Sequence, residues 1–195
     1  MTASETRAGL PIIAFADARA FEAWLAAQPA EAPGLWLKLA KQGNPESRLT
    51  KAEAVDAALC HGWIDGQLNP YDEAWWLTRF TPRKPRSKWS RNNRERAEEL
   101  IGAGRVTPRG LAEIEAARAD GRWAAAYASA SKAEVPADLQ AALDANPAAA
   151  AFFATLTGNN RYAILYRIGA GKRLETRARK IAEFVAMLER HETIY

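Results

Sequence analysis

Hydrophobic positions in the first 82 residues alternate in ways that predict strands separated by helices. Four short runs with β-type composition predict strands at 12–15, 35–39, 63–69 and 75–81. A helix is predicted to begin after Asp17, a plausible N-cap, and to stop before Pro29. A second helix is predicted to begin at Thr50, where Thr50 and Glu53 form a capping box, and to end at Gly62.

Beyond residue 82 the hydrophobic period is that of helices. Ser90 caps one predicted helix, and Thr107 followed by Pro108 begins another. The remaining predicted helices are 137–145, 147–156, 160–168 and 174–191. The pattern therefore predicts an α+β fold, a small antiparallel sheet with packed helices, followed by an all-helical C-terminal part. We expect an α+β domain over 1–128, a connector over 129–135 and a helical region over 136–195.

The last two predicted strands read as a hairpin. If residues 70–74 form its loop, Ile64 faces Phe80 on the core side and Asp65 faces Arg79 on the other side. A slip of one residue would turn the faces over, so the register is a hypothesis. An Asp65–Arg79 pair would then either fix this register or serve a function.

Composition limits the classes of protein. The chain has 195 residues, 48% of them hydrophobic, and a single cysteine, Cys60. One cysteine excludes an internal disulfide framework, and with two histidines it makes a transition-metal site improbable, so we expect no cofactor. No apolar run approaches the ~20 residues that span a bilayer, and residues 1–10 lack the apolar core of a signal peptide. We therefore expect a cytoplasmic protein without a membrane span.

The net charge of +4 is concentrated in two basic blocks, 78–109 and 161–195, which acidic stretches separate. In both blocks several cations gather where a predicted helix begins, and each costs about 0.3–1 kcal/mol there at low salt. A bound anion would offset this cost. Each block also has an explanation without a ligand. The first could be a solvated basic loop, and in the second the aliphatic stems of the lysine and arginine side chains could cover the edge of the core. The repeated placement favours one anion site that both blocks share.

Three segments together resemble a known bacterial family. They are 62–66 (GWIDG), 79–90 (RFTPRKPRSKWS) and 170–181 (AGKRLETRARKI). In this order they are similar to the YdeI/OmpD-associated family, also called bacteriocin-protection proteins. The resemblance implies a role in tolerance of bacteriocins or cationic antimicrobial peptides, and it implies no catalytic residues.

Two classes of function follow. The first is a non-catalytic protein that binds an anionic small molecule or a phosphate-bearing ligand; nucleic acid is less favoured, because no helix-turn-helix or RNA-binding signature is present. Its candidate ligand-binding residues are Trp63, Asp65, Arg79, Arg83, Arg86, Lys88, Trp89, Arg91, Lys172, Arg173 and Arg177. The alternative is an enzyme acting on a phosphorylated or carboxylated small molecule, with Asp65 as acid/base and Arg79 as clamp. No second carboxylate or histidine stands at a persuasive spacing, so the sequence favours the binding protein over the catalyst.

Two further features have structural explanations that outweigh functional ones. Cys60 and His61 adjoin at a helix C-terminus, where the helix dipole disfavours a thiolate, so we expect Cys60 to be dispensable. Of the tryptophans, Trp24, Trp36 and Trp76 are predicted to lie in the core. Those beside polar or basic residues, Trp63, Trp75 and Trp89, are candidates for stacking on a ligand.

Overall fold

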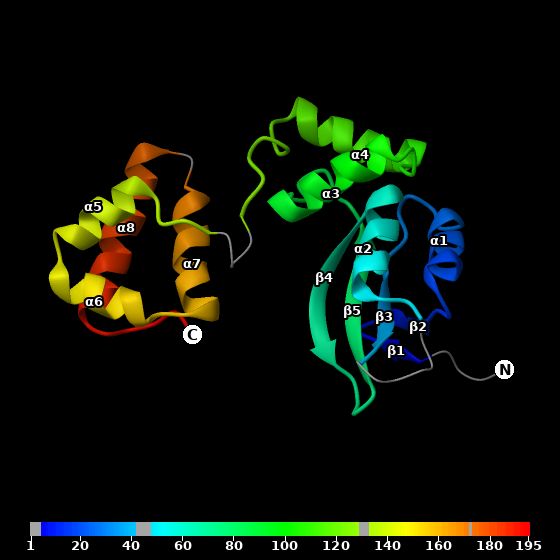
Figure 1. Cartoon of the computed structure of the whole chain (residues 1–195), viewed down its shortest axis with the longest axis horizontal. Helices are drawn as coiled ribbons and strands as arrows, with labels where there is room; N and C mark the ends of the chain where they lie inside the picture. Colours follow the sequence, from blue (N-terminus) through cyan, green and yellow to red (C-terminus); the bar gives the residue numbers. More distant parts are fainter. Residues whose placement is uncertain (1–4, 42–47, 129–132, 172) are drawn as a thin grey trace. The chain divides into compact units, whose positions relative to one another are not determined.

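The computed structural model describes residues 5–41, 48–128, 133–171 and 173–195. The chain forms two compact units, which we call the N-terminal unit (Met1–Ala126) and the C-terminal unit (Tyr127–Tyr195) (Figure 1). Residues 129–132 of the predicted connector lie outside the described residues.

The N-terminal unit is built on a five-stranded sheet of order β1-β2-β3-β5-β4. Its strands are β1 (Thr6–Arg7), β2 (Leu10–Ala14), β3 (Leu35–Ala40), β4 (Trp63–Pro70) and β5 (Trp75–Pro82). Three of the four strand pairs are antiparallel, and β2 and β3 are parallel because helix α1 (Ala18–Ala26) connects them as a crossover. The four predicted strands are present, and the two-residue β1 is an addition.

The predicted hairpin register is wrong. Asp65 pairs with Phe80 instead of Arg79, and Ile64 pairs with Thr81. An irregularity between Asp65 and Leu68 then shifts the pairing by one further residue. A bulge of this kind adds one residue to one strand, so a register counted from a symmetric loop misses it.

Helices α1 and α2 (Lys51–Cys60) cover one face of this sheet (Figure 1). The core between them is made of alternate strand residues and the inner sides of the two helices. Its members include Phe21, Leu25, Leu35, Leu37, Ala54, Ala57, Trp63 and Phe80. Helices α3 (Arg91–Gly102) and α4 (Pro108–Ala119) enclose a second cluster with the end of α2, around Leu59, Trp89, Leu100 and Ile114.

The helix starts follow the caps that the sequence predicted. Asp17 accepts from the backbone of Ala20, and the Thr50–Glu53 capping box has both of its hydrogen bonds. Ser90 accepts from the backbone of Asn93, and Thr107 precedes a proline at the first helical position. Each cap satisfies a backbone donor that the helix itself leaves without a partner.

The C-terminal unit is all-helical. Its helices are α5 (Ala137–Asp144), α6 (Pro147–Thr155), α7 (Gly158–Gly169) and α8 (Leu174–Glu189). They pack around the apolar residues Leu139, Leu143, Phe153, Ile164, Ile168 and Leu188. A sheet with packed helices followed by a helical part confirms the predicted α+β class. Among the described helices, none is long and apolar enough to cross a bilayer.

Candidate functional site

The basic segment that follows β5 is anchored by one buried arginine. Arg83 is only 6% exposed, and its guanidinium carbon lies 3.5 Å from the centroid of the Trp89 ring. Its Nη1 donates to the carbonyl of Lys88 at 3.3 Å, and its backbone N–H donates to the carbonyl of Gly62 at 2.9 Å. These contacts hold the two ends of segment 83–89 together. Arg83 and Trp89, both predicted to bind a ligand, are buried and support the segment from beneath; direct contact with a ligand stays a prediction.

Between these ends the segment forms a turn whose cations face solvent. The backbone N–H of Lys84 donates to Ser87 Oγ at 2.9 Å, and the N–H of Ser87 donates to the carbonyl of Lys84 at 2.8 Å. Arg122 Nη1 donates to the carbonyl of Ser87 at 3.0 Å. Lys84, Arg86 and Lys88 are exposed on this turn. Because hydrogen bonds already fix the backbone, an anion that binds here orders little of the chain.

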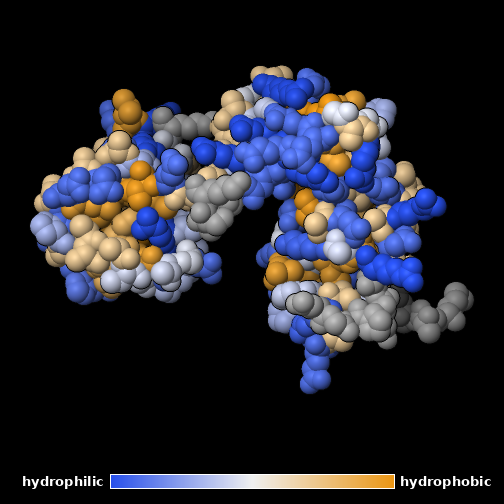
Figure 2. Space-filling model, viewed as in Figure 1, coloured by the Kyte–Doolittle hydropathy of each residue, from blue (hydrophilic) through white to orange (hydrophobic). Residues whose placement is uncertain are grey.

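The turn leads directly into the N-terminus of α3, which adds to its positive potential. Ser90 caps the helix, Arg91 is exposed at its first position, and no acidic residue lies in the first turn. In the described part of the chain, none of Lys84, Arg86 and Arg91 forms a salt bridge. Figure 2 shows hydrophilic side chains over α3. We call Lys84, Arg86, Lys88 and Arg91 the α3 basic cluster; its cations and free helix N–H groups suit an anion.

Asp65 and Arg79 lie on opposite faces of the sheet. Asp65 pairs with Phe80 on the face that the helices cover, and its Oδ2 lies 3.9 Å from Lys51 Nζ of α2. Arg79 pairs with Trp36 and is exposed on the other face. The predicted pair therefore does not form, and Arg79 cannot clamp a substrate against an Asp65 acid/base. Trp63, predicted to bind ligand, is fully buried in the core beneath the helices.

On the face of the sheet away from the helices, cations lie over aromatic rings. Lys38 Nζ lies 4.3 Å from the Tyr71 ring and 5.0 Å from the Trp75 ring, and the Arg7 guanidinium lies 5.4 Å from the Trp36 ring. These contacts stabilise the rings, and Trp36 and Trp75 are buried, so Trp75 is not a stacking surface for a ligand. The predicted environments of the neighbouring tryptophans are reversed, because Trp75 is buried and Trp76 is exposed.

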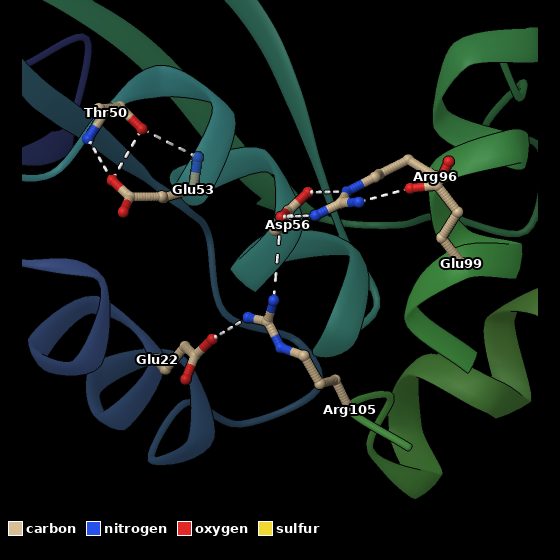
Figure 3. A network of polar contacts seen from close by, with 7 residues as sticks. All are labelled: Glu22, Thr50, Glu53, Asp56, Arg96, Glu99 and Arg105. Atoms are coloured by element: carbon tan, nitrogen blue, oxygen red, sulfur yellow. Dashed lines mark hydrogen bonds and ion pairs between the residues drawn. The ribbon is translucent and has the colours of Figure 1, made fainter. Parts of the chain in front are cut away.

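Sequence reasoning missed an ion-pair network centred on Asp56 of α2 (Figure 3). Arg96 of α3 donates to both carboxylate oxygens of Asp56 and also contacts Glu99. Arg105 donates to Glu22 of α1 at 2.8 Å and lies 3.9 Å from Asp56. The network connects α1, α2 and α3, so Arg96 serves the fold and is not available to a ligand. The residues stand far apart in the sequence, and no local pattern reveals them.

The second basic block is largely used by the C-terminal unit itself. Arg177 donates to both oxygens of Asp138 from α5 and to the carbonyl of Ile168 at 2.9 Å. Lys180 Nζ donates to the carbonyl of Arg167 at 3.1 Å. Both cations thus satisfy carbonyls at the C-terminus of α7, where positive charge is favoured. The hydrogen bond from Arg177 also lowers the pKa of the Asp138 carboxyl below its ordinary value.

Arg177 thus has structural partners within the unit, and its predicted role in ligand binding stays a prediction. Arg173 is exposed at the start of α8 with no side-chain cap, and Lys172 lies outside the described residues. The two basic blocks belong to different units. A site shared between them stays a prediction.

Cys60 and His61 have the environments of structural residues. Cys60 is buried, and desolvation raises the pKa of its thiol, which opposes formation of a nucleophilic thiolate. Burial also lowers the pKa of His61. Within the described residues, no group of three or more His, Cys, Asp or Glu side chains could hold a metal ion.

In a comparison with known proteins, two parts of the chain match family models. Residues 13–113, more than half of the chain, match a family described as Domain of unknown function (DUF8412). Residues 132–191 match the family described as Bacteriocin-protection, YdeI or OmpD-Associated. No curated protein and no solved structure matches the chain. The first match covers the end of β2, strands β3, β4 and β5, helices α1, α2 and α3, and the first half of α4, and the second covers the four helices of the C-terminal unit.

Proposed function

The chain belongs to the DUF8412 family, and its C-terminal part matches the bacteriocin-protection, YdeI or OmpD-associated family; on that premise we propose a role in tolerance of bacteriocins or cationic antimicrobial peptides. We propose further that the protein acts by binding an anionic small molecule or a phosphate-bearing ligand, without catalysis. The proposed compartment is the cytoplasm, where its single thiol, Cys60, stays reduced.

The observation that carries anion binding is the α3 basic cluster. Its exposed cations stand on a turn fixed by hydrogen bonds, at a helix N-terminus that has no acidic residue in its first turn. In the described residues, by contrast, Arg96 and Arg177 of the basic blocks are each neutralised by a carboxylate. Exposed lysine ammonium groups and arginine guanidinium forks, beside the free backbone N–H groups of the helix start, match the charge and hydrogen-bonding geometry of a phosphate group.

Thermal unfolding in phosphate tests the proposal. At equal ionic strength, phosphate should raise the unfolding temperature more than chloride does, because a ligand that binds only the native state stabilises it. The gain is about 1.4 kcal/mol when phosphate is present at ten times its Kd. Arg86→Glu should abolish this increment without unfolding the protein.

A matched control removes a cation elsewhere in the N-terminal unit. Arg19 on α1 is also exposed, so Arg19→Glu makes the same change in net charge away from the α3 basic cluster. It should keep the phosphate increment. Equal stabilisation by phosphate and chloride, or equal loss in both variants, would refute binding at this cluster. Arg173→Glu tests the shared site: loss of the increment supports it, and an unchanged increment confines the anion to the N-terminal unit.

A further inference from the structure

The C-terminal unit carries a groove that its own helices do not fill. It has a volume of about 620 Å³ and lies along α8, with α5 forming its other wall. Its apolar lining includes Ala142 of α5 and Leu174, Ala178, Ile181, Ala182 and Val185 of α8. These α8 residues recur at helical spacing, so they form one continuous stripe along the helix.

The outer side of this stripe is exposed to solvent. Leu174, at the start of α8, is 85% exposed, an unusual state for a leucine that lines a groove. Ala178 and Ala182 are also exposed, and their small side chains let a second backbone approach closely. Figure 2 shows hydrophobic side chains on the surface over α5 and α8. A helix that lays its apolar face into a groove is a common mode of recognition.

The charges around the groove indicate the charge of its occupant. On one wall, Arg177 and Asp138 neutralise each other. Glu189 lines the groove at the C-terminal end of α8. Glu175 is not part of the lining, but it follows the lining residue Leu174 and is exposed in the first turn of α8. Neither glutamate forms a salt bridge with a described residue. Glu189 also stands in the last turn of α8, where the helix dipole disfavours a carboxylate, so helix stability does not explain it.

We propose that this groove binds a cationic amphipathic helix of a peptide or partner protein. The two glutamates are 14 positions apart on α8, about 21 Å along its axis, so the bound helix would have about four turns. It would present apolar residues at i, i+3, i+4 and i+7 to the stripe and a lysine or arginine towards each glutamate. A second copy of this chain fits less well, because an antiparallel pair of α8 helices would bring Glu175 of one copy near Glu189 of the other.

A synthetic leucine–lysine peptide of about 18 residues, long enough to form an amphipathic helix, is the probe. Binding of the labelled peptide to the full chain is followed by fluorescence anisotropy, beside a peptide with glutamate in place of lysine. The lysine peptide should bind and the glutamate peptide should not. Ala182→Arg should abolish binding, because it fills the groove and adds a like charge at an exposed position that tolerates it.

Glu189→Gln is compared with Glu183→Gln, a matched change on the same helix outside the groove. Loss of one exposed ion pair should weaken binding about twofold to fivefold in the first variant and leave it unchanged in the second. Equal binding of the two peptides, equal effects of the two glutamine variants, or no binding of the lysine peptide would overturn the proposal. So would a chain that is dimeric in solution and is made monomeric by Ala182→Arg, since the occupant would then be a second copy. This inference rests on the C-terminal unit alone, so it stands or falls independently of the phosphate response.

Discussion

Replacement of Arg83 should show how the α3 basic cluster is held in place. In Arg83→Ala the side chain that covers the Trp89 ring and donates to the Lys88 carbonyl is lost. In Arg83→Met an apolar chain of similar length keeps most of the packing and removes the guanidinium. Because Arg83 is almost fully buried, both changes act in a region that excludes water.

The expected magnitude follows from the contacts. A desolvated cation–π contact contributes about 2 kcal/mol. A hydrogen bond from a charged donor contributes about 1.5–3 kcal/mol. Relief of the cost of burying a charge offsets part of this loss. We expect Arg83→Ala to lower the free energy of unfolding by about 2–4 kcal/mol, since it also leaves a cavity against Trp89. Arg83→Met should cost less, about 0–2 kcal/mol.

Urea unfolding followed by tryptophan fluorescence measures these free energies, with Arg86→Ala as the control. Arg86 is a nearby cation of the same segment, but it is exposed, so its removal should change stability by about 0.5 kcal/mol or less. Arg83→Met should remain folded and lose much of the stabilisation by phosphate, because the turn is no longer tied to Trp89. If Arg83→Ala costs no more than Arg86→Ala, the buried arginine does not organise the segment and the reasoning fails.

Three further predictions concern the rest of the fold. Gly110→Ala would place a Cβ 2.3 Å from the carbonyl oxygen of Cys60 and should lower the free energy of unfolding by about 1–3 kcal/mol, as measured in urea. Gly102 is a helical glycine with open space around it, so Gly102→Ala should leave this free energy unchanged or raise it. Changes of the same sign in both variants would contradict the close packing at Gly110. Cys60→Ala should leave ligand binding intact, and a folded variant without phosphate response would show that the thiol matters. Because Arg177 lowers the pKa of Asp138, their pair stabilises the fold above the unfolded pKa of about 3.9, and this stabilisation is lost as pH falls through the folded pKa. Asp138→Asn should therefore flatten the dependence of the free energy of unfolding on pH below about pH 4. An unchanged pH dependence would exclude this contribution.

The parts of the fold that local chemistry determines could be predicted from the sequence. A cap and the first helical turn lie within four residues, so Asp17, Thr50, Ser90 and Thr107 identified the starts of their helices. The strand segments followed in the same way from short apolar runs. By contrast, pairing between strands depends on loop geometry and bulges. The irregularity after Asp65 is invisible in an alternating pattern, and it moved that residue to the helix-covered face.

Burial of tryptophan could not be predicted from its neighbours in the chain. Trp89 stands between a lysine and a serine, in a strongly basic segment, which suggested an exposed ring. Its environment is instead decided by Leu100 of the next helix and by two residues distant in the sequence, Leu59 and Trp123, whose ring centroid lies 4.7 Å away. A large aromatic side chain stabilises the fold most when it is buried, so it can pack into a hydrophobic cluster even where its neighbours in the sequence are polar.

The two basic blocks show why a cation in a sequence is a weak indication of a binding site. Both blocks place lysine and arginine near the start of a helix, so the sequence predicts the same role for the two blocks. In the C-terminal unit the end of α7 lies beside α8, so carbonyls of α7 accept hydrogen bonds from Arg177 and Lys180, whereas Arg173 is exposed. In the N-terminal unit the neighbouring turn uses its own Ser87 and the guanidinium of Arg122 for its backbone, and Lys84 and Arg86 face solvent. What distinguishes a binding cation from a structural one is therefore whether a helix C-terminus or carboxylate lies within reach. By that criterion the α3 basic cluster is the better candidate for the proposed anion site, because Lys84 and Arg86 form no salt bridge with a described residue, whereas Arg177 is paired with Asp138.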